Sequence, residues 1–218
     1  MSNASERRQK ILDEIASAAH VAKRDAADVQ LVAVSKTRSE DEIEALIDAG
    51  QRDFGESRVQ EALGKWPSIL NRHADIRLHC IGRLQSNKAA EAVRLFDVIH
   101  SVDRTSLLQS LAEEADKADR RPSIYVQVNI GEEEQKGGCS IGEVGALLEA
   151  VHASPLRLAG LMAIPPLGPE PAPFFALLAE LARRHDVNGL SMGMSGDFRS
   201  AVMLGATTVR VGTALFED

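Results

Sequence analysis

Apolar residues follow two different spacings along this chain, and the alternation between them predicts its elements. Residues 5–24 carry apolar side chains at near-helical spacing among charged neighbours, Ile11 and Ile15 among them, which predicts an amphipathic helix. After this helix, short apolar runs typical of strands alternate with helical segments. The eight predicted strands are Leu31–Val34, Arg52–Phe54, Arg77–Cys80, Asp97–His100, Ser123–Val128, Leu156–Gly160, Gly189–Ser191 and Thr207–Val211.

Eight strand-then-helix units, with no long linker or low-complexity segment between them, predict a closed (β/α)8 TIM barrel of the α/β class. Residues 1–218 then form a single domain, with a doubly wound open sheet as the alternative. The proline-rich segment Pro165–Pro173 is expected to be a stiff surface loop and not a domain boundary. Ser39 with Glu42 three residues later predicts a capping box, and Gly50 predicts the end of that helix.

Composition and charge argue against several classes of partner. The chain has 218 residues, a formal net charge of −7 and 4% aromatic residues, so it lacks the basic surface and the stacking platform that nucleic-acid binding requires. No apolar run approaches the roughly 20 residues that cross a bilayer, and the N-terminus lacks the apolar centre of a signal peptide. We therefore expect a cytoplasmic protein without nucleic-acid or membrane partners.

Cysteine and histidine spacing gives no indication of a metal. Cys80 and Cys139 stand far apart and form no ligand or redox motif, so we expect both to be reduced and structural. We predict no metal site. The histidines without ligand spacing are His73, His100, His152 and His185.

Lys36 ends the first predicted strand and is the first candidate for chemistry. In a barrel, the loops that follow the strands surround one mouth, where active sites are built. A lysine whose stem packs among apolar neighbours there has its charged form disfavoured by desolvation, which makes a nucleophilic amine available for a Schiff base. The alternative is a strand-end lysine whose amine simply reaches water.

Two small-residue loops follow the seventh and eighth predicted strands, where phosphate sites of these barrels are commonly built. Glycines let a ligand approach the backbone, and hydroxyls and free N–H groups supply donors. The alternative is that glycine and serine only form turns here. The candidate residues are Ser191, Gly193, Ser195, Gly196, Gly212 and Thr213. A phosphate site facing Lys36 points to a phosphorylated aldehyde as the ligand.

Arg210 precedes the second of these loops and would face the far side of such a ligand. A guanidinium keeps its proton, so beside a pyridine ring it would leave the ring nitrogen unprotonated and weaken the ring as an electron sink. The alternative is a salt bridge at the rim of the barrel.

Eight motifs, in order and at barrel spacing, resemble the pyridoxal-phosphate homeostasis proteins of the YggS/PROSC type, whose fold is similar to the N-terminal barrel of alanine racemase (fold type III of pyridoxal-phosphate proteins). The resemblance covers nearly the whole chain. The motifs are "VAVSKT", "FGESRVQE", "HCIGRLQSNK", "SVDR", "VNIGEEEQKGG", "GLMAI", "LSMGMSGDF" and "TTVRVGTALF".

This resemblance implies a barrel that carries pyridoxal 5′-phosphate on Lys36 as an internal aldimine. It implies that Ser195, Gly212 and Thr213 hold the phosphate and that Arg210 sits at the pyridine nitrogen. The family is regarded as buffering or delivering the cofactor in vitamin B6 homeostasis, with pyridoxal-phosphate-dependent apoenzymes as possible acceptors and no established catalytic turnover.

An amino-acid racemase or lyase of the same fold is the alternative function. A two-base racemase needs a second acid or base on the opposite face of its substrate. The single tyrosine, Tyr125, is predicted within the fifth strand and not at its end, and no second domain could supply another. We therefore expect a cofactor carrier, and a scaffold that has lost the cofactor is a third alternative, which the intact loops disfavour. A barrel of this size needs no partner to bury its core, so we expect a monomer, with a weak dimer as the alternative.

Further residues are candidates for the surroundings of the cofactor. Ser57 stands where the resembling family commonly has asparagine, so a hydroxyl or a water would replace an amide contact. His79 could carry a proton or be satisfied by the backbone, and Asn129 and Met162 could line the cavity or pack and bond within it. Lys88 and Lys136 lie in family motifs but are expected to be solvated. Departures from the family pattern are Ser57, Cys80, Arg83 and Gly137.

Overall fold

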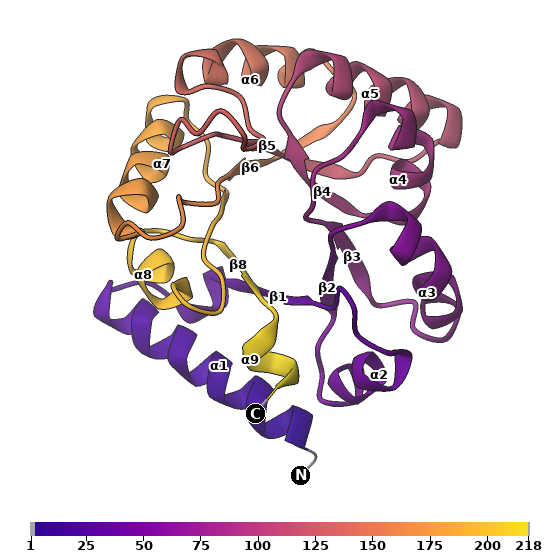
Figure 1. Cartoon of the computed structure of the whole chain (residues 1–218), viewed down its shortest axis with the longest axis vertical. Helices are drawn as coiled ribbons and strands as arrows, with labels where there is room; N and C mark the ends of the chain where they lie inside the picture. Colours follow the sequence, from indigo (N-terminus) through magenta and orange to yellow (C-terminus); the bar gives the residue numbers. More distant parts are fainter. Residues whose placement is uncertain (1–2, 218) are drawn as a thin grey trace.

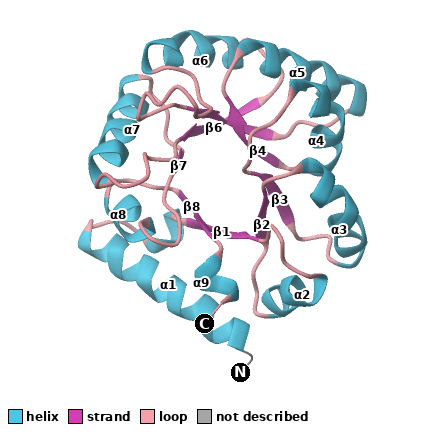
Figure 2. Ribbon diagram, viewed as in Figure 1, coloured by secondary structure: helices cyan, strands magenta, loops and turns pink. Residues whose placement is uncertain are grey.

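The computed structural model describes residues 3–217, and within this range eight parallel strands close into a barrel in the order β1 to β8. Figure 2 shows the strands as an inner ring surrounded by helices. The ladder between β1 and β8, with Ala33 opposite Val211, closes the ring. The predicted TIM barrel is confirmed, and an open sheet is ruled out. The strands are β1 Gln30–Val34, β2 Asp53–Glu56, β3 Arg77–Cys80, β4 Val98–Val102, β5 Ser123–Gln127, β6 Arg157–Met162, β7 Leu190–Ser191 and β8 Thr208–Val211.

Helices follow the strands and cover the outside of the barrel. The α-helices are α1 Asn3–Val21, α2 Glu40–Asp48, α3 Val59–Arg72, α4 Ala89–Leu95, α5 Thr105–Ala118, α6 Val144–His152, α7 Ala172–Arg184, α8 Phe198–Met203 and α9 Thr213–Phe216, and the 3₁₀ turns are η1 Ala26–Asp28, η2 Ser86–Lys88 and η3 Ile141–Glu143. Figure 1 shows α1 beside α8 and α9, with the two ends of the chain at the same edge. The first helix thus completes the ring of helices next to the last.

Local capping signals set two helix boundaries. Ser39 and Glu42 form the predicted capping box of α2, each side chain accepting from the backbone N–H of the other. The first helix ends at Val21, three residues before the prediction, because Lys23 takes a left-handed φ of +56° and Arg24 N–H bonds back to the Ala19 carbonyl. Short-range chemistry therefore fixes both boundaries.

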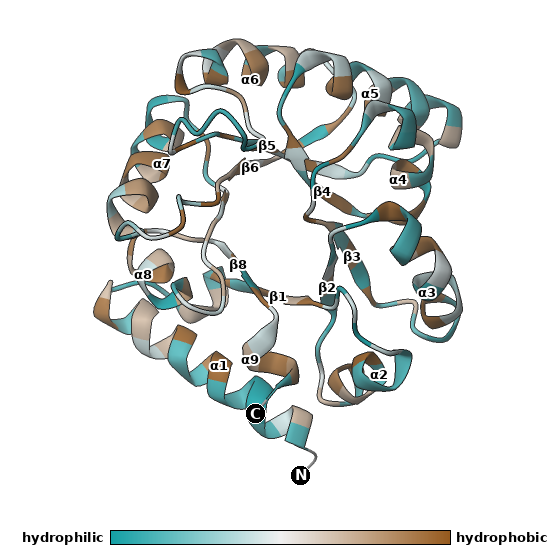
Figure 3. Ribbon diagram, in the orientation of Figure 1, coloured by the Kyte–Doolittle hydropathy of each residue, from teal (hydrophilic) through white to brown (hydrophobic). Residues whose placement is uncertain are grey.

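The apolar core lies between the strands and the helices. Figure 3 shows that the helices carry both hydrophobic and hydrophilic positions, as expected for elements with one buried face. Trp66 of α3 and Phe175 of α7 are among the largest fully buried side chains. Both cysteines are free and buried, and burial raises the pKa of each thiol to about 12, as expected for structural cysteines.

Most of the proline-rich segment predicted as a surface loop connects β6 to α7, and Leu167 within it is almost fully exposed. Its first residue, Pro165, is buried, and its last, Pro173, already belongs to α7. No helix between residues 3 and 217 is long and apolar enough to cross a membrane.

A chain of buried polar side chains crosses the barrel interior. At the end of β2 that lies away from the mouth, Asp53 Oδ1 is 3.0 Å from His79 Nε2. His79 Nδ1 is 3.0 Å from His100 Nε2, and His100 Nδ1 is 2.8 Å from Ser191 Oγ. Arg210 completes the chain by donating Nη1–H to Ser191 Oγ at 2.5 Å.

The hydrogen bonds along this row of side chains can be donated in only one direction, from Arg210 toward Asp53. Arg210 can only donate and the Asp53 carboxylate can only accept, so we assign the Ser191 hydroxyl proton toward His100, and an Nε2–H to each histidine. Every polar atom along the line is then satisfied with both histidines neutral. Burial, with smaller contributions from His79 and Arg210, holds the pKa of His100 well below its usual value of 6.5.

We predict that His100→Gln makes stability less sensitive to acid. Because His100 is kept neutral in the folded protein and takes up a proton when unfolded, it contributes stability that is complete above pH ~6.5 and is lost as pH falls, by up to about 1.4 kcal/mol per pH unit. Urea unfolding between pH 7.5 and 5 should show a shallower decline in the variant. The exposed His152→Gln is the control. Parallel curves for wild type and His100→Gln would contradict the assignment.

Candidate functional site

A cavity of about 600 Å³, called the mouth cavity, opens where the strands end. Of the predicted site residues, it is lined by Lys36, Ser57, Asn129, Ser195, Arg210, Gly212 and Thr213. Its other lining residues are Val34, Thr37, Arg38, Ile81, Gly82, Arg83, Gln127, Val128, Lys136, Gly137, Ile164, Met194 and Gly196. Five of these side chains are cations and none is acidic, in a chain whose net charge is −7. The mouth cavity therefore favours an anionic ligand.

Lys36 offers an unengaged amine to this cavity. Its Nζ has no hydrogen-bond or ion-pair partner among the described residues. The expectation that its stem packs among apolar neighbours was wrong, because Lys36 is exposed. The physical reason is a turn directly after β1: Ser35 is still buried, but Thr37 takes a φ of +62°, which carries the chain outward.

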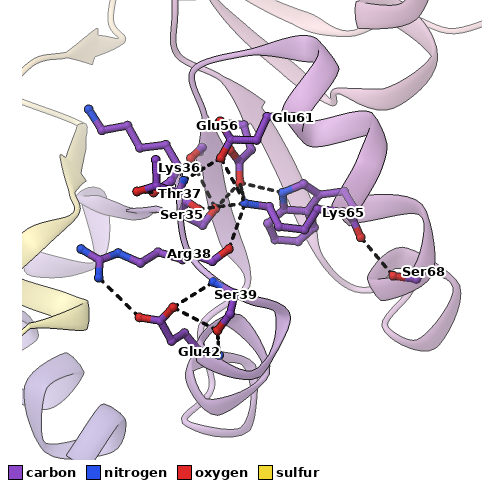
Figure 4. A network of polar contacts seen from close by, with 12 residues as sticks. Ser35, Lys36, Thr37, Arg38, Ser39, Glu42, Glu56, Glu61, Lys65 and Ser68 are labelled. Carbon is purple, nitrogen blue, oxygen red and sulfur yellow. Dashed lines mark hydrogen bonds and ion pairs between the residues drawn. The ribbon is translucent and has the colours of Figure 1, made fainter.

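A buried ion pair fixes the backbone on both sides of Lys36 (Figure 4). Lys65 of α3 lies 2.7 Å from Glu56 Oε1 at the end of β2, a carboxylate that is fully buried. The same ammonium donates to the carbonyls of Ser35, at 2.9 Å, and Arg38, at 3.4 Å. One lysine thus anchors the residues that bracket the Lys36 turn.

The remaining contacts of this network hold the carboxylate and the turn. Glu56 Oε1 also accepts from Ser35 Oγ at 2.8 Å and from Trp66 Nε1 at 2.9 Å. Thr37 N–H donates to Glu61 at 2.6 Å, which supports a left-handed conformation that is costly for a β-branched residue. Figure 4 shows the Lys36 side chain pointing away from the Glu56–Lys65 pair. The turn is held rigidly while its amine remains free.

The loops after β7 and β8 are bonded to each other. Gly212 N–H donates to Ser195 Oγ at 3.3 Å, and Arg210 N–H donates to the Gly193 carbonyl at 2.9 Å. Gly196 faces open space at the cavity, and the Thr213 hydroxyl has no partner among the described residues. The two loops together form a cradle of small residues at the cavity.

Gly193 serves a different purpose from the one predicted. Its φ is +96°, and a Cβ there would come within 2.6 Å of Ala201 Cβ and 2.9 Å of Phe198 Cα. The glycine is required because α8 packs closely against this turn, and not because a ligand approaches it.

Arg210 is buried at the base of the mouth cavity without a carboxylate partner. Its guanidinium donates to Ser191 Oγ and to the Ala163 carbonyl at 3.2 Å. The alternative of a salt bridge at the rim is contradicted by this burial. Desolvation lowers the pKa of Arg210 to about 10, so it remains charged at neutral pH.

Three predicted site residues lie in the barrel wall and do not line the mouth cavity. Ser191 is fully buried, and its hydroxyl is already engaged by Arg210 and His100. His79 bonds to His100 and to Asp53, not to the backbone as its alternative supposed. Met162 belongs to β6, which runs two residues further than predicted, and packs in the interior. Of the three, Ser191 contacts the lining of the mouth cavity, through its hydrogen bond with Arg210.

Two motif lysines are more engaged than expected. Lys136 is half-buried, lines the mouth cavity, donates to the Pro165 carbonyl at 3.1 Å and pairs with Glu133 at 2.6 Å. Lys88 is half-buried and pairs with Glu91 at 3.2 Å. The expectation of two solvated lysines was therefore wrong. Lys36 remains the lysine of the cavity with a free amine.

Asn129 lines the cavity, but its amide is occupied. Its Nδ2 donates to the Glu133 carbonyl at 2.9 Å, and its Oδ1 accepts from Glu133 N–H at 3.2 Å. The alternative role, bonding a loop, is the one that the structure shows. Ser57 also lines the cavity, and it has no side-chain hydrogen bond within residues 3–217.

Sequence reasoning missed the Glu56–Lys65 pair. Glu56 lies in the motif "FGESRVQE", and the predicted strand ended before it at Phe54, whereas β2 includes it. An acid in an apolar strand must find a partner, and that signal was present in the sequence. Its partner is a helix residue nine positions later, which only the packing of α3 on β2 identifies.

Apart from Lys136, whose amine is engaged by Pro165 and Glu133, no second acid or base lies beside Lys36 in the described lining of this cavity. The described lining contains no histidine, tyrosine, cysteine or carboxylate. Tyr125 is buried inside the barrel, stacks on His100 and bonds to Thr208 at 3.0 Å. Within residues 3–217, no group of three or more His, Cys, Asp or Glu side chains could hold a metal ion. The arrangement can bind a phosphorylated aldehyde through one amine, a phosphate cradle and a buried guanidinium.

Comparisons with known proteins agree with this geometry. The sequence model of the family "Alanine racemase, N-terminal domain" matches residues 2–218. A pyridoxal phosphate homeostasis protein of Pseudomonas aeruginosa is 42% identical over 224 residues, covering 99% of this chain and 96% of that protein. The structure of PipY from Synechococcus elongatus with pyridoxal phosphate bound matches with a TM-score of 0.80 at 39% identity, covering 93% of this chain and 99% of PipY.

A more distant likeness concerns the fold alone. An alanine racemase of Clostridium difficile matches with a TM-score of 0.69 at 12% identity, and the match covers 94% of this chain and 57% of the racemase. The family match, the close relatives and the cavity geometry lead to one conclusion: the chain belongs to the pyridoxal phosphate homeostasis protein family, built on the alanine racemase N-terminal barrel.

Proposed function

We propose that this protein binds pyridoxal 5′-phosphate at the mouth cavity and buffers or delivers it within the cell. The observation that carries the proposal is a free primary amine in a cavity lined by five cations and no acidic side chain. Such a lining suits a ligand with a phosphate dianion and an aldehyde. The names of the relatives and the bound cofactor of PipY support the same ligand.

Each element of the cavity has a role in this proposal. Lys36 would hold the aldehyde of the cofactor as a Schiff base, with loss of water. Ser195, Gly212 and Thr213 would hold the phosphate, with the Ser195 and Thr213 hydroxyls as donors and Gly212 leaving room for it, since the Gly212 N–H itself donates to Ser195 Oγ. Arg210 would lie at the pyridine nitrogen and, because it stays protonated, would leave that nitrogen without a proton. The ring is then a weak electron sink.

The lining supports a carrier and not a racemase or lyase. Proton transfer on both faces of an amino acid needs a second positioned acid or base. In the described lining of the mouth cavity the other amine, Lys136, is engaged by Pro165 and Glu133, which leaves Lys36 as the free one. Pyridoxal-phosphate-dependent apoenzymes are the proposed acceptors, since the cavity opens at the protein surface. Release to them requires only that the Schiff base is hydrolysed or exchanged.

We predict that Lys36→Ala abolishes the covalent attachment and that Lys136→Ala does not. Lys136 is the matched control, because it lines the same cavity but its amine is engaged by Pro165 and Glu133. Wild type and Lys136→Ala should turn yellow with pyridoxal phosphate, and borohydride should fix the cofactor on the peptide that contains Lys36. An unchanged absorbance band in Lys36→Ala would refute this site.

The same proteins separate the carrier from the enzyme. Wild-type holoprotein is incubated with alanine, serine and other amino acids, and racemised or cleaved products are measured by chiral chromatography. We expect none above the level of Lys36→Ala. Turnover that depends on Lys36 would replace the carrier with an enzyme.

We predict that the Glu56–Lys65 pair sets the reactivity of Lys36. The double variant Glu56→Gln with Lys65→Met leaves no unpaired buried charge, but the Ser35 and Arg38 carbonyls lose their shared donor. The Lys36 turn should loosen, and the rate of Schiff-base formation in stopped-flow absorbance should fall by roughly tenfold or more. Lys117→Met, which removes an exposed lysine paired only within α5, is the control. An unchanged rate would show that the pair serves stability alone.

We propose that the protein is a monomer. Large apolar side chains exposed on the described part are few, with Leu167 in a loop and Met194 at the mouth cavity. Gel filtration with light scattering should give the mass of one chain at every concentration tested. A stable, concentration-independent dimer would overturn this expectation.

A further inference from the structure

A second cavity, called the side cavity, adjoins the mouth cavity over the starts of α3 and α5. It has a volume of about 620 Å³ and shares Ser57 and Arg83 with the mouth cavity. Its full lining is Ser57, Arg58, Val59, Gln60, Arg83, Leu84, Gln85, Ser86, Lys88 and Arg104. The size is within the range of small-molecule sites.

The side cavity is strongly cationic. Arg58, Arg83, Lys88 and Arg104 line it, and no carboxylate does. Two of these cations already have ion-pair partners. Arg104 pairs with Asp103 at 2.5 Å, and Lys88 pairs with Glu91.

The other two cations are free. Arg58 and Arg83 are exposed, and their guanidinium groups make no hydrogen bond or ion pair with any described residue. Two unpaired arginines that line one concave surface, in a chain of net charge −7, form a receptor for a compact anion.

Neutral donors add to this charge. Ser57, Gln60, Gln85 and Ser86 contribute hydroxyl and amide groups to the lining. Arg104 Nη2 donates to Ser86 Oγ and to the Leu84 carbonyl, both at 3.3 Å, which ties the start of α5 to the loop after β3. The wall between the cations is therefore ordered by hydrogen bonds before any ligand arrives.

The helix ends at this cavity violate the usual capping preference. Arg58 and Arg104 are the N-cap residues of α3 and α5, and neither helix has a side-chain cap. Positive side chains at positive helix ends are unfavourable, and an anion between them would reverse the sign of that interaction. These two helix ends support an anion site, in addition to the cationic lining of the side cavity.

We propose that the side cavity is a second binding site for a phosphate monoester. Resting on the function proposed above, its ligand is a phosphorylated form of vitamin B6 on its way to or from the mouth cavity, with Arg83 and Ser57 contacting both positions. Arg58 and Arg83 bind the phosphate dianion, and the neutral donors orient the rest of the molecule. A protein that exchanges its cofactor would then hold the incoming molecule beside the outgoing one.

The test measures binding after the mouth cavity has been blocked. Pyridoxal phosphate is loaded and fixed with borohydride, and the blocked protein is titrated by calorimetry with pyridoxine 5′-phosphate, an alcohol that cannot form a Schiff base. We expect one site per chain, weakened at least tenfold in Arg58→Gln and unchanged in Arg157→Gln. Arg157 is the matched control, because it is an exposed arginine without a partner at the opposite end of the barrel.

Three further ligands identify what the site recognises. Pyridoxine without phosphate should not bind, and inorganic phosphate and adenosine monophosphate should bind more weakly than pyridoxine 5′-phosphate. Inorganic phosphate or the nucleotide binding as tightly would overturn the vitamin assignment. No second site, or equal weakening in Arg58→Gln and Arg157→Gln, would overturn the proposal as a whole.

Arg58→Asp guards against misfolding as an explanation. It supplies α3 with a good N-cap, so the midpoint of thermal unfolding should rise while binding at the second site is lost. Loss of both stability and binding would contradict the proposal. If Lys36 proves unable to hold the cofactor, the same titrations on Lys36→Ala still test the side cavity, so failure of the proposed function and failure of this site are distinguishable.

Discussion

The pairing of β1 with β8 is the constraint on which the site depends. The ladder sets Val32 opposite Arg210 and Ala33 opposite Val211. It therefore joins two segments that lie near opposite ends of the sequence. Because the strands are parallel, both continue toward the same mouth, where one delivers Lys36 and the other Gly212. The contact remains close beyond the ladder, since a Cβ on Gly212 would lie 3.4 Å from Val34. Amine and phosphate cradle therefore meet only in a closed barrel.

Two buried charges of opposite sign flank this junction, and the fold treats them differently. Glu56 is neutralised by Lys65, and the pair restrains the turn that carries Lys36. Arg210 has no carboxylate partner, and a chain of neutral donors and acceptors holds it instead. An ion pair would satisfy Arg210 internally and reduce its attraction for a ligand. Desolvation without an ion pair lowers the pKa of Arg210, with Asp197 opposing that shift, and the guanidinium keeps a positive charge that an anionic molecule can meet.

Sequence reasoning predicted the barrel well because each unit carries its own local signals. Alternating apolar runs, the Ser39 capping box and the glycines after strands are all short-range features. It failed where the outcome depends on a side chain's direction. Whether Ser191 faces the ligand or the interior is decided by its position in β7 and by the neighbours Arg210 and His100. Lys36 lines the mouth cavity, where the sequence placed it, but its exposure follows from the φ of Thr37, which no sequence pattern indicated.

Helix capping differs among the loops that surround the mouth. Ser39 caps α2 directly after the Lys36 turn, and Ser140 caps the turn before α6. By contrast, α3 and α5 begin with Arg58 and Arg104, which provide no side-chain cap. These two arginines share the lining of the side cavity, so their positive charge lies next to the positive end of each helix. An anion bound at the proposed second site would offset this repulsion, which couples the stability of both helix ends to binding there.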